Sequence, residues 1–419
     1  MTQLIRNISE ANCERKISSV QAPFHSKNLA KSESNIASRS QTISLEFEQI
    51  LSVSSNVDLK SSASVGLLPE NLSKNRYNDI IPFDFNRVRL HKGATKTPNE
   101  NIASYINGSH IQLSHDIPMI AAQGPTAKTA GSFFQMLWEQ NVTIIVCAVN
   151  ETENEQSKCA KYWPSNRMEE YRTKHYTVQL AREPVEMHSQ GNYIIRYLKL
   201  ICTYSNQFRH IWHYHFIQWP DHGVPDNLNS VCDLIFSMKR RNSNAPILVH
   251  CSAGCGRTGT VIGLSKCTNV IFNGNAKDVK SLSIFKIVYN LRHQRIGMVQ
   301  TLAQYRFMYQ VLIQLINHYL YNHSNRKVQS WRNSSLRMLT PHNAKKCDRE
   351  FTSTTRTIDQ LGYSVYRQIP IATTPSFSFR ENKDGQQNND NKISNKLKNH
   401  LLRHFNNLTT EINNFNRHL

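Results

Sequence analysis

Residues 245–260 read APILVHCSAGCGRTGT. The stretch starts with an apolar run that is typical of a buried strand, and it continues into a turn built from small residues. From about Arg257 to Phe272 the residues then favour a helix. A strand, a glycine-rich turn and a helix in this order are the usual context of a phosphate site, because the turn amides and the helix N-terminus attract anions.

Cys251 and Arg257 frame this turn with the spacing Cys-x5-Arg. The residues between them let the backbone curl tightly and point N–H groups inward; they are Ser252, Ala253, Gly254, Cys255 and Gly256. The same positive field favours a thiolate over a thiol, which makes Cys251 a candidate nucleophile, and the planar guanidinium of Arg257 suits two phosphate oxygens. A cysteine is more often a buried core thiol, but the loop, the arginine and the strand favour the nucleophile here.

Strand and helix patterns alternate on both sides of the turn. Short β-branched or alternating runs predict strands at 142–149, 193–204 and 211–219. Apolar residues at three- and four-residue spacings predict helices at 227–241, 281–294 and 302–319. The sequence therefore predicts an α/β (α+β) domain, in which a twisted mixed sheet is flanked by helices.

The two ends of the chain differ in composition from its middle. Residues 1–44 and 321–419 are rich in polar and basic residues, whereas most aromatic and aliphatic runs lie at 45–320. We therefore expect a single domain at 45–320, preceded by a disordered extension and followed by a basic, Asn-rich, mostly disordered tail. Lys396–Phe405 is a candidate for a short amphipathic helix in that tail.

The formal net charge of +20 raises nucleic acid or an anionic membrane as a partner of the tail. Aromatic and basic residues do not interleave there, so we interpret the tail as a solvated segment. The nine cysteines lack disulfide-framework or zinc-finger spacing, which indicates a reducing compartment. The sequence shows neither a signal-peptide pattern nor 18 consecutive apolar residues, and we expect a soluble, cytoplasmic monomer.

A thiolate displaces an oxygen from phosphorus only if a nearby general acid protonates that oxygen or the oxygen is otherwise stabilised. WPDHGVP at 219–225 offers Asp221, set among Pro and Gly residues that suit a stiff, hinged flap. An Asp in such a turn usually only stabilises the turn, so these residues by themselves do not decide whether Asp221 is a general acid.

Two further segments are ambiguous by themselves. Gln300 and Gln304 lie four residues apart and project from one side of a helix start, as ordinary surface glutamines also do. Tyr77 could stack on a substrate ring and Asp79 could accept peptide N–H groups, although a Tyr between polar residues is more often a surface residue.

HCSAGCGRTG at 250–259 resembles the signature loop of the classical, phosphotyrosine-specific protein tyrosine phosphatases. The resemblance implies that Cys251 attacks phosphorus to form a cysteinyl-phosphate, that Arg257 binds the phosphoryl group and that His250 tunes the thiolate. It also implies that Thr258 stabilises the sulfur as the leaving group of the second step. Cys255 departs from the family's usual aliphatic residue, either as a packing substitution or as a partner in reversible oxidation of Cys251.

WPDHGVP is similar to the mobile acid loop of the same family, which implies Asp221 as the acid and Trp219 as a hinge and packing residue. Several histidines near this loop could suggest a metal site, namely His210, His213, His215 and His222. The segment FRHIWHYHFIQ, however, resembles the strand that precedes the acid loop in the family. We therefore expect neither a metal nor another cofactor.

LRHQRIGMVQTLAQYRF resembles the family's glutamine loop, which implies that Gln300 positions the hydrolytic water and Gln304 assists at the phosphate. Arg292 and Arg295 fall where the family often has arginines at the pocket edge. KNRYNDIIPFDFNRVRL resembles the phosphotyrosine-recognition loop, whose Tyr makes the pocket too deep for phosphoserine. That role falls to Tyr77, with Asp79 as the contact to the peptide backbone.

Two more matches concern supporting residues. AAQGPTAKTAGSFFQMLWEQ implies packing and an ion pair for Glu139, and SKCAKYWP places Lys158 near the acid loop. Glu153 is the best candidate to orient Arg257, with Glu155 as its rival. Ser104, Gly108 and Gln156 depart from the family's usual residues.

The resemblance covers roughly 45–320 and predicts hydrolysis of phosphotyrosine on proteins without a metal. The alternative is a phosphotyrosine-binding pseudophosphatase that shelters its ligand without turnover. In its Asn-rich tails and in the positions that depart from the family's usual residues, the chain is also similar to phosphatases carried by bracoviruses of parasitoid wasps. That origin would place the activity in the cytoplasm of a host cell, on proteins of its signalling pathways.

Overall fold

The structure is a computed structural model that describes residues 43–91, 99–113, 117–182, 186–188, 191–241, 244–273 and 282–337. The predictions for the N-terminal extension and for a helix at Lys396–Phe405 lie outside these residues. In the described ranges no helix is long and apolar enough to cross a bilayer.

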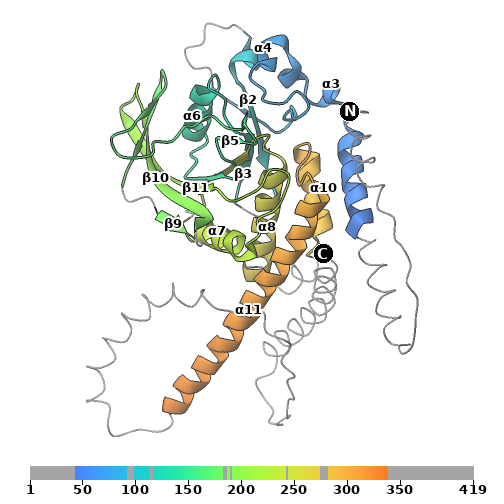
Figure 1. Cartoon of the computed structure of the whole chain (residues 1–419), viewed down its shortest axis with the longest axis vertical. Helices are drawn as coiled ribbons and strands as arrows, with labels where there is room; N and C mark the ends of the chain where they lie inside the picture. Colours follow the sequence, from blue (N-terminus) through green and yellow to red (C-terminus); the bar gives the residue numbers. More distant parts are fainter. Residues whose placement is uncertain are drawn as a thin grey trace. The chain divides into compact units, whose positions relative to one another are not determined.

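A ten-stranded mixed sheet forms the frame of the described chain (Figure 1). Its path runs β1-β2-β3-β12-β4-β11-β10-β8-β7, with β9 paired to β10, while β5 and β6 form a separate hairpin. The strands are β1 Arg87–Arg89, β2 Tyr105–Ile111, β3 Met119–Gln123, β4 Ile144–Cys147, β5 Thr152–Glu153, β6 Gln156–Ser157, β7 Tyr171–Arg172, β8 Tyr176–Leu180, β9 Glu186–His188, β10 Tyr193–Cys202, β11 Gln207–Phe216 and β12 Ile247–Cys251.

The centre of the sheet is parallel and buried. β12 pairs in parallel with β3 and β4, and every residue of these three strands is buried. This burial explains why their sequences are continuous apolar runs without alternation. Cys251 pairs with Gln123, so the carboxyl ends of β12 and β3 lie at the same edge of the sheet, which is where open α/β sheets usually bind ligands.

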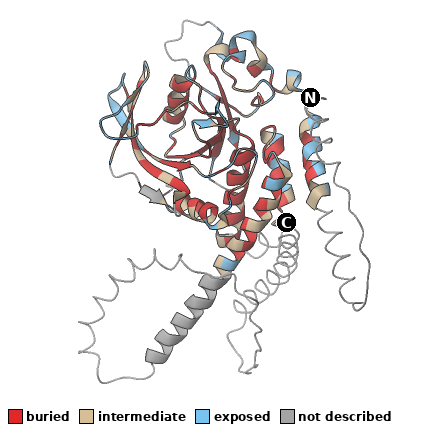
Figure 2. Ribbon diagram, viewed as in Figure 1, coloured by how far each residue is buried: buried red, intermediate tan, exposed pale blue. Residues whose placement is uncertain are grey.

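Helices pack against this frame. α8 (Gly256–Asn273) is buried along most of its length, contacts β12 and β3, and packs against α7, α10 and α11 (Figures 1 and 2). A helix that is apolar on most sides belongs in the core, and α8 has 13 buried residues of 18. The other helices are a segment at 43–55 and α3 Leu59–Ser62, η1 Ser64–Leu67, α4 Pro69–Leu72, α5 Glu100–Ala103, α6 Ala130–Glu139, α7 Leu228–Arg241, α10 Ile284–Gln294 and α11 Leu302–Arg337.

The predicted mixed α/β fold is confirmed, and the elements differ from the sequence prediction mainly at their ends. β11 ends at Phe216 because the chain leaves the sheet there to form the acid loop. α11 continues to Arg337, well past the range 302–319 that the apolar spacing indicated. Backbone hydrogen bonding carries a helix beyond the residues that pack on a core, so apolar periodicity underestimates its length.

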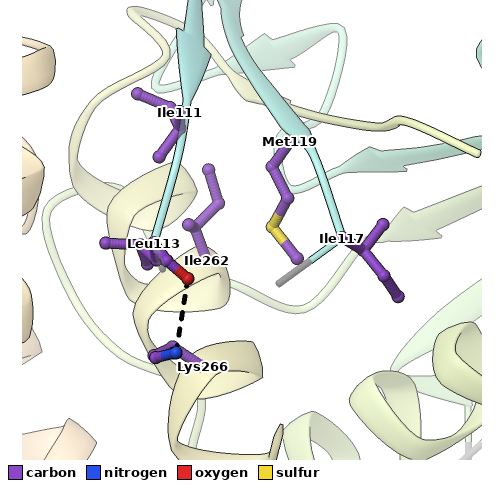
Figure 3. A pocket seen from close by; sticks show the side chains of 6 residues that line it. All are labelled: Ile111, Leu113, Ile117, Met119, Ile262 and Lys266. Atoms are coloured by element: carbon purple, nitrogen blue, oxygen red, sulfur yellow. Dashed lines mark hydrogen bonds between the residues drawn. The ribbon is translucent and has the colours of Figure 1, made fainter. Parts of the chain in front are cut away.

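A small, mostly apolar pocket lies near the opposite edge of the sheet (Figure 3). It includes Met119 at the first position of β3, whereas Gln123 at the last position pairs with Cys251. Lys266 closes one side by donating a hydrogen bond to the Leu113 carbonyl at 3.3 Å. The pocket is therefore separate from the turn at 251–257.

Candidate active site

The turn at 251–257 forms a ring of amides because partners outside it hold its carbonyl groups. The Ser252 carbonyl accepts from the Gly124 amide at 2.9 Å. Arg295 donates to the carbonyls of Gly254 at 2.7 Å and Ala253 at 3.0 Å. The Cys255 carbonyl accepts from the Gly259 amide at 2.7 Å. In a trans peptide the N–H points opposite to the carbonyl, so the amides of residues 253–256 face the other side, as an anion cradle requires.

Gly254 is the residue whose backbone makes this curl possible. Its φ is +72°, in the region that side chains with a Cβ rarely adopt. A Cβ there would lie 2.1 Å from the Ala122 carbonyl oxygen, since the turn packs directly on β3. Both the dihedral angle and the contact therefore require glycine.

Gly254→Ala is expected to lower the free energy of unfolding by about 1–3 kcal/mol because a strained residue must be held in place. Denaturant unfolding of the purified chain measures the change. Gly131→Ala is the matched control, since Gly131 lies in α6 and the nearest atom to an added Cβ is 4.0 Å away. The explanation is wrong if both variants unfold at the same denaturant concentration as the unaltered chain.

Cys251 ends β12 and lies at the floor of the turn, with 6% of its surface exposed. Behind it, the buried His250 contacts the Cys251 carbonyl through Nδ1 at 3.2 Å and the Tyr162 hydroxyl through Nε2 at 2.7 Å. Thr258 follows in the first turn of α8, and its buried Oγ1 has no hydrogen-bond partner among the described residues. A hydroxyl without a hydrogen-bond partner in the protein interior is costly.

Arg257 is held by a carboxylate before any ligand arrives. Its Nη1 and Nη2 donate to the two oxygens of Glu153 at 2.8 and 2.7 Å, and Nη1 also donates to the Ala148 carbonyl at 3.0 Å. Burial alone would lower the pKa of Arg257, but the hydrogen bonds and charge of Glu153, with the charges of Cys251 and Asp221, raise it. The guanidinium is therefore a fixed, permanent cation beside the cradle.

Glu153 takes this position and Glu155 does not, which resolves the alternative left open by the sequence. Glu155 is exposed and sits in the turn of the β5–β6 hairpin, where Asn154 and Glu155 have φ of 50° and 63°. The hairpin turn keeps Glu155 away from Arg257, whereas Glu153 lies on strand β5 and pairs with Arg257.

Asp221 reaches the same guanidinium from the acid loop. Its Oδ1 accepts from Arg257 at 3.0 Å, and its Oδ2 pairs with the Lys158 ammonium at 2.9 Å. Burial raises the pKa of Asp221, but the Lys158 hydrogen bond and the Arg257 charge outweigh it, and the net effect is a lowered pKa. Trp219 anchors the loop, because its buried ring donates to the Gly223 carbonyl at 3.1 Å.

Lys158→Ala is expected to move the pH dependence of kcat/KM. The acid form of Asp221 is lost as the pH rises through its pKa, which Lys158 lowers. Removing Lys158 raises that pKa, so the limb on which kcat/KM falls with rising pH should shift to higher pH. Lys161→Ala, at an exposed ion pair with Glu169, should leave the profile unchanged. An unshifted limb in Lys158→Ala contradicts this pairing.

Gln300 and Gln304 lie against the first residue of α8. A Cβ added to Gly256 would meet Gln304 Oε1 at 2.9 Å and the Gln300 side chain at 3.0 Å. Gln304 is buried and accepts from the Gln300 amide at 2.9 Å, whereas Gln300 is exposed at the mouth of the turn. The acid loop joins them through Thr301, whose Oγ1 donates to the His222 carbonyl at 3.3 Å.

Tyr77 stands at the rim of the cradle, and its hydroxyl contacts Ser252 Oγ at 2.9 Å. Ser252 Oγ also donates to the Lys158 carbonyl at 2.9 Å. Asp79, two residues further on, is exposed to solvent. The structure thus brings Tyr77 to the site, while contact between Asp79 and a peptide stays a prediction.

Arg292 and Arg295 differ from the sequence prediction, which placed them at the pocket edge. Both are buried, and burial lowers the pKa of each guanidinium. Arg292 donates to the Met298 and Val299 carbonyls at 2.9 and 2.7 Å, which fixes the loop before Gln300. Spacing along the chain did not reveal which side of the loop each arginine faces.

Glu139 lies outside this cluster, and its hydrogen-bond partners are His91 and Gln135. Its carboxylate accepts from the His91 amide at 2.9 Å and the Gln135 side chain at 2.7 Å. A histidine ring nitrogen of His91 lies 3.2 Å away, which is an ion pair only when that ring is protonated. Its place is structural, at the C-terminal end of α6.

The comparisons with known proteins agree with this geometry. The family model for the protein-tyrosine phosphatase matches residues 71–314, more than half of the chain. The chain belongs to the protein-tyrosine phosphatase family. Cys251, Arg257, Asp221 and Gln300 all fall inside the matched range.

Relatives in this phosphatase family are identical to the chain at about a third of the aligned positions. Human tyrosine-protein phosphatase non-receptor type 12 is 35% identical over 255 residues, which are 60% of this chain and 31% of that protein. Rat type 21 is 37% identical over 292 residues, or 66% of this chain and 23% of that protein. The chain thus spans about a third or less of the length of these relatives.

A solved phosphatase structure, PTPN18 in complex with HER2-pY1248 phosphor-peptides, has a TM-score of 0.58 and 30% identity. The match covers 65% of this chain and 99% of that one. Among the residues of this chain that the structure describes, no group of three or more His, Cys, Asp or Glu residues is arranged to hold a metal.

Two residues of this phosphatase site were missed by the sequence analysis. Arg76 ties the Tyr77 segment to the sheet edge, because its guanidinium donates to the Gly124, Pro125 and Ser157 carbonyls at 2.8–3.2 Å. Tyr162 supports the turn from behind through its contact with His250. Both residues lie inside motifs that the sequence analysis quoted, so their position in the KNRYNDII and SKCAKYWP segments was an available signal.

Proposed function

We propose that the chain hydrolyses phosphotyrosine on proteins by way of a cysteinyl-phosphate on Cys251. The observation that carries the proposal is the turn itself. Its carbonyls are tied outward, so its amides and the guanidinium of Arg257 converge on the place where Cys251 ends β12. A phosphoryl group bound there would meet a nucleophile from below and hydrogen-bond donors from the sides.

In the first step, the Cys251 sulfur forms a bond to phosphorus and the bond from phosphorus to the tyrosyl oxygen breaks. That oxygen needs a proton, because the phenolate of a tyrosine, whose hydroxyl has a pKa of about 10, is a poor leaving group. Asp221 is the carboxyl group that the acid loop brings to Arg257, at 3.0 Å. A phosphate that takes the Arg257 donors removes one positive partner of Asp221 and adds negative charge beside it, and both changes favour the protonated acid.

In the second step, water attacks the cysteinyl-phosphate and Cys251 leaves as a thiolate. Asp221, now ionised, accepts the proton of that water, and Gln300 and Gln304 are placed to orient it against the cradle. Thr258 Oγ1 is available to donate to the departing sulfur. Inorganic phosphate then leaves, and the cycle returns every group to its starting state.

The substrate class follows from the depth of the site. Cys251 has 6% of its surface exposed, and Tyr77 rises from the rim of the turn beside Ser252. A phosphoserine side chain is shorter than phosphotyrosine by a phenyl ring and would not reach the sulfur. The PTPN18 structures with HER2 phosphor-peptides support the same substrate class for this chain. A role in cytoplasmic tyrosine-phosphorylation signalling is part of this proposal.

The test is phosphate release by the purified full chain from two peptides that differ only in phosphotyrosine or phosphoserine, with EDTA present. We expect turnover of the phosphotyrosyl peptide alone, unaffected by the chelator. Tyr77→Ala should reduce this preference by raising KM for the phosphotyrosyl peptide, since the ring loses its stacking wall. Binding of the phosphotyrosyl peptide without any phosphate release would instead establish a pseudophosphatase.

A further inference from the structure

The helix at 43–55 packs one face on α10 and α11 (Figure 1). Phe47, Ile50 and Val53 are buried on this face, with exposed fractions of 6%, 0% and 8%. Their spacing of three residues keeps their side chains on the same side of the helix. The helix precedes residue 71, where the match to the phosphatase family model begins, yet Phe47 and Ile50 belong to the main hydrophobic core.

Arg292 of α10 joins this helix to the backbone just before Gln300. Its Nε and Nη2 donate to the carbonyls of Met298 and Val299 at 2.9 and 2.7 Å. Its Nη1 donates to Ser54 Oγ of the helix at 3.0 Å. One guanidinium therefore connects the helix to the two residues that precede Gln300 in the chain.

The surroundings of Arg292 make its position depend on these neutral acceptors. The residue has 2% of its surface exposed, and none of the ion pairs among the described residues includes it. Burial lowers the pKa of Arg292 to about 10, so the side chain is still a cation at neutral pH. The Phe47 ring lies 5.8 Å from the guanidinium carbon. A buried cation that loses an acceptor is costly, so we expect Arg292 to shift when Ser54 is altered.

Glu46 ties the same helix to the residue that follows Gln304. Its Oε2 accepts from the hydroxyls of Tyr305 at 2.7 Å and Tyr309 at 2.8 Å. Burial raises the pKa of both tyrosines, so both stay protonated donors at neutral pH. The Phe47 ring also packs on the Tyr305 ring, with 5.5 Å between their centroids. The helix is therefore fixed to the first turns of α11, where Gln304 lies.

We propose that the helix at 43–55 is a positioning element for the second step of the reaction, in which water attacks the cysteinyl-phosphate. This inference rests on the proposed function, in which Gln300 and Gln304 orient that water. Arg292 holds the backbone directly before Gln300, and Tyr305 directly follows Gln304. A small displacement of an orienting group slows a reaction strongly, because the reacting atoms must meet in a narrow geometry. Releasing the helix should therefore slow the attack of water.

The first step should not depend on this helix. Its groups are Cys251, Arg257 and Asp221, and the last two are held by each other and by groups at 148–158. Among the described residues, none of the hydrogen bonds of Arg257 or Asp221 reaches the helix at 43–55. Loss of the helix contacts should thus slow decay of the cysteinyl-phosphate and leave its formation unchanged, whereas a general loss of folded structure would slow both.

Two contact variants each remove one connection of the helix, Ser54→Ala to Arg292 and Glu46→Ala to the two tyrosines. Two control variants accompany them. Ser52→Ala alters an exposed residue of the same helix, whose Oγ donates to the Gln49 carbonyl within the helix at 2.7 Å. Ser54→Thr keeps a hydroxyl at the contact position and should behave as the unaltered chain.

The first experiment follows a single turnover of the full chain, with enzyme in excess over a ³²P-phosphotyrosyl peptide and acid quenching at millisecond intervals. Enzyme-bound label and released phosphate are both counted, which gives the rates of formation and decay of the cysteinyl-phosphate. In the contact variants we expect decay to slow by about tenfold, as loss of a hydrogen bond to a charged group does, with formation unchanged. The control variants should match the unaltered chain. Unchanged decay in either contact variant, or equal slowing of both rates, would overturn the proposal.

The second experiment tests the positioning without activity, by hydrogen exchange of the full chain in a peptide that covers 296–301. The Val299 amide donates to the Cys255 carbonyl at 3.3 Å, and the Gln300 amide donates to Gln304 Oε1 at 2.9 Å. Both amides are protected from exchange while this segment stays in place. We expect faster exchange there in the contact variants than in the control variants.

The two experiments separate the possible failures. Equal exchange in contact and control variants, with normal turnover of the unaltered chain, would overturn the positioning role alone. Absence of both enzyme-bound label and phosphate release in the unaltered chain would refute the proposed function, and with it the role of the helix in the second step.

Discussion

Cys251→Ser is expected to lower kcat on both p-nitrophenyl phosphate and a phosphotyrosyl peptide by at least about 10⁴-fold, as loss of a catalytic nucleophile does in other enzymes. A serine hydroxyl stays protonated at neutral pH, so the cradle would still bind phosphate but hold no nucleophile. Steady-state kinetics measure the loss, and calorimetric titration with a phosphotyrosyl peptide measures the retained binding.

The matched control is Cys232→Ser, at a partly exposed cysteine of α7 outside the site. It should retain the activity of the unaltered chain. If Cys251→Ser still turned over substrate within tenfold of the control, the phosphoryl group would have to pass to another residue or directly to water.

Asp221→Ala is expected to lower kcat by about 10²–10⁴-fold on a phosphotyrosyl peptide, the usual contribution of a general acid. The loss should be much smaller on p-nitrophenyl phosphate, because p-nitrophenolate leaves without a proton more readily than tyrosine does. The ratio of the two losses is the informative quantity, since a purely structural defect would slow both substrates equally.

Asp226→Ala supplies the comparison for that ratio. Asp226 is exposed just after the acid loop and should change neither substrate's kcat. Equal losses on the two substrates in Asp221→Ala would mean that Asp221 acts by holding Arg257 and Lys158 in place and not by giving up a proton.

The groups proposed to act on the phosphoryl could be predicted because they lie in short segments. Cys251 and Arg257 belong to one tight turn, so a spacing of small residues already indicates the cradle. For Asp221 the Pro and Gly residues around it left its role open, and the resemblance to the family's acid loop was needed to assign it. The parallel centre of the sheet was similarly visible as uninterrupted apolar runs.

The groups that support the turn could be predicted only in part, because several of their contacts join segments far apart in the sequence. Arg295 was expected at the pocket edge but reaches the carbonyl of Gly254, and the sequence does not say which side of the glutamine loop faces the turn. Glu153 was the preferred partner of Arg257, and the dihedral angles of one hairpin turn exclude its rival Glu155.

The central claim is that Cys251 itself carries phosphorus during the reaction. The direct measurement is acid quenching of the full chain within milliseconds of mixing with a ³²P-phosphotyrosyl peptide, followed by tryptic mapping of the label. We predict label on peptide 242–257, with fragment masses that assign it to Cys251 and not to Cys255. Label on any other residue, or substrate turnover with no labelled enzyme at any time, would contradict the account.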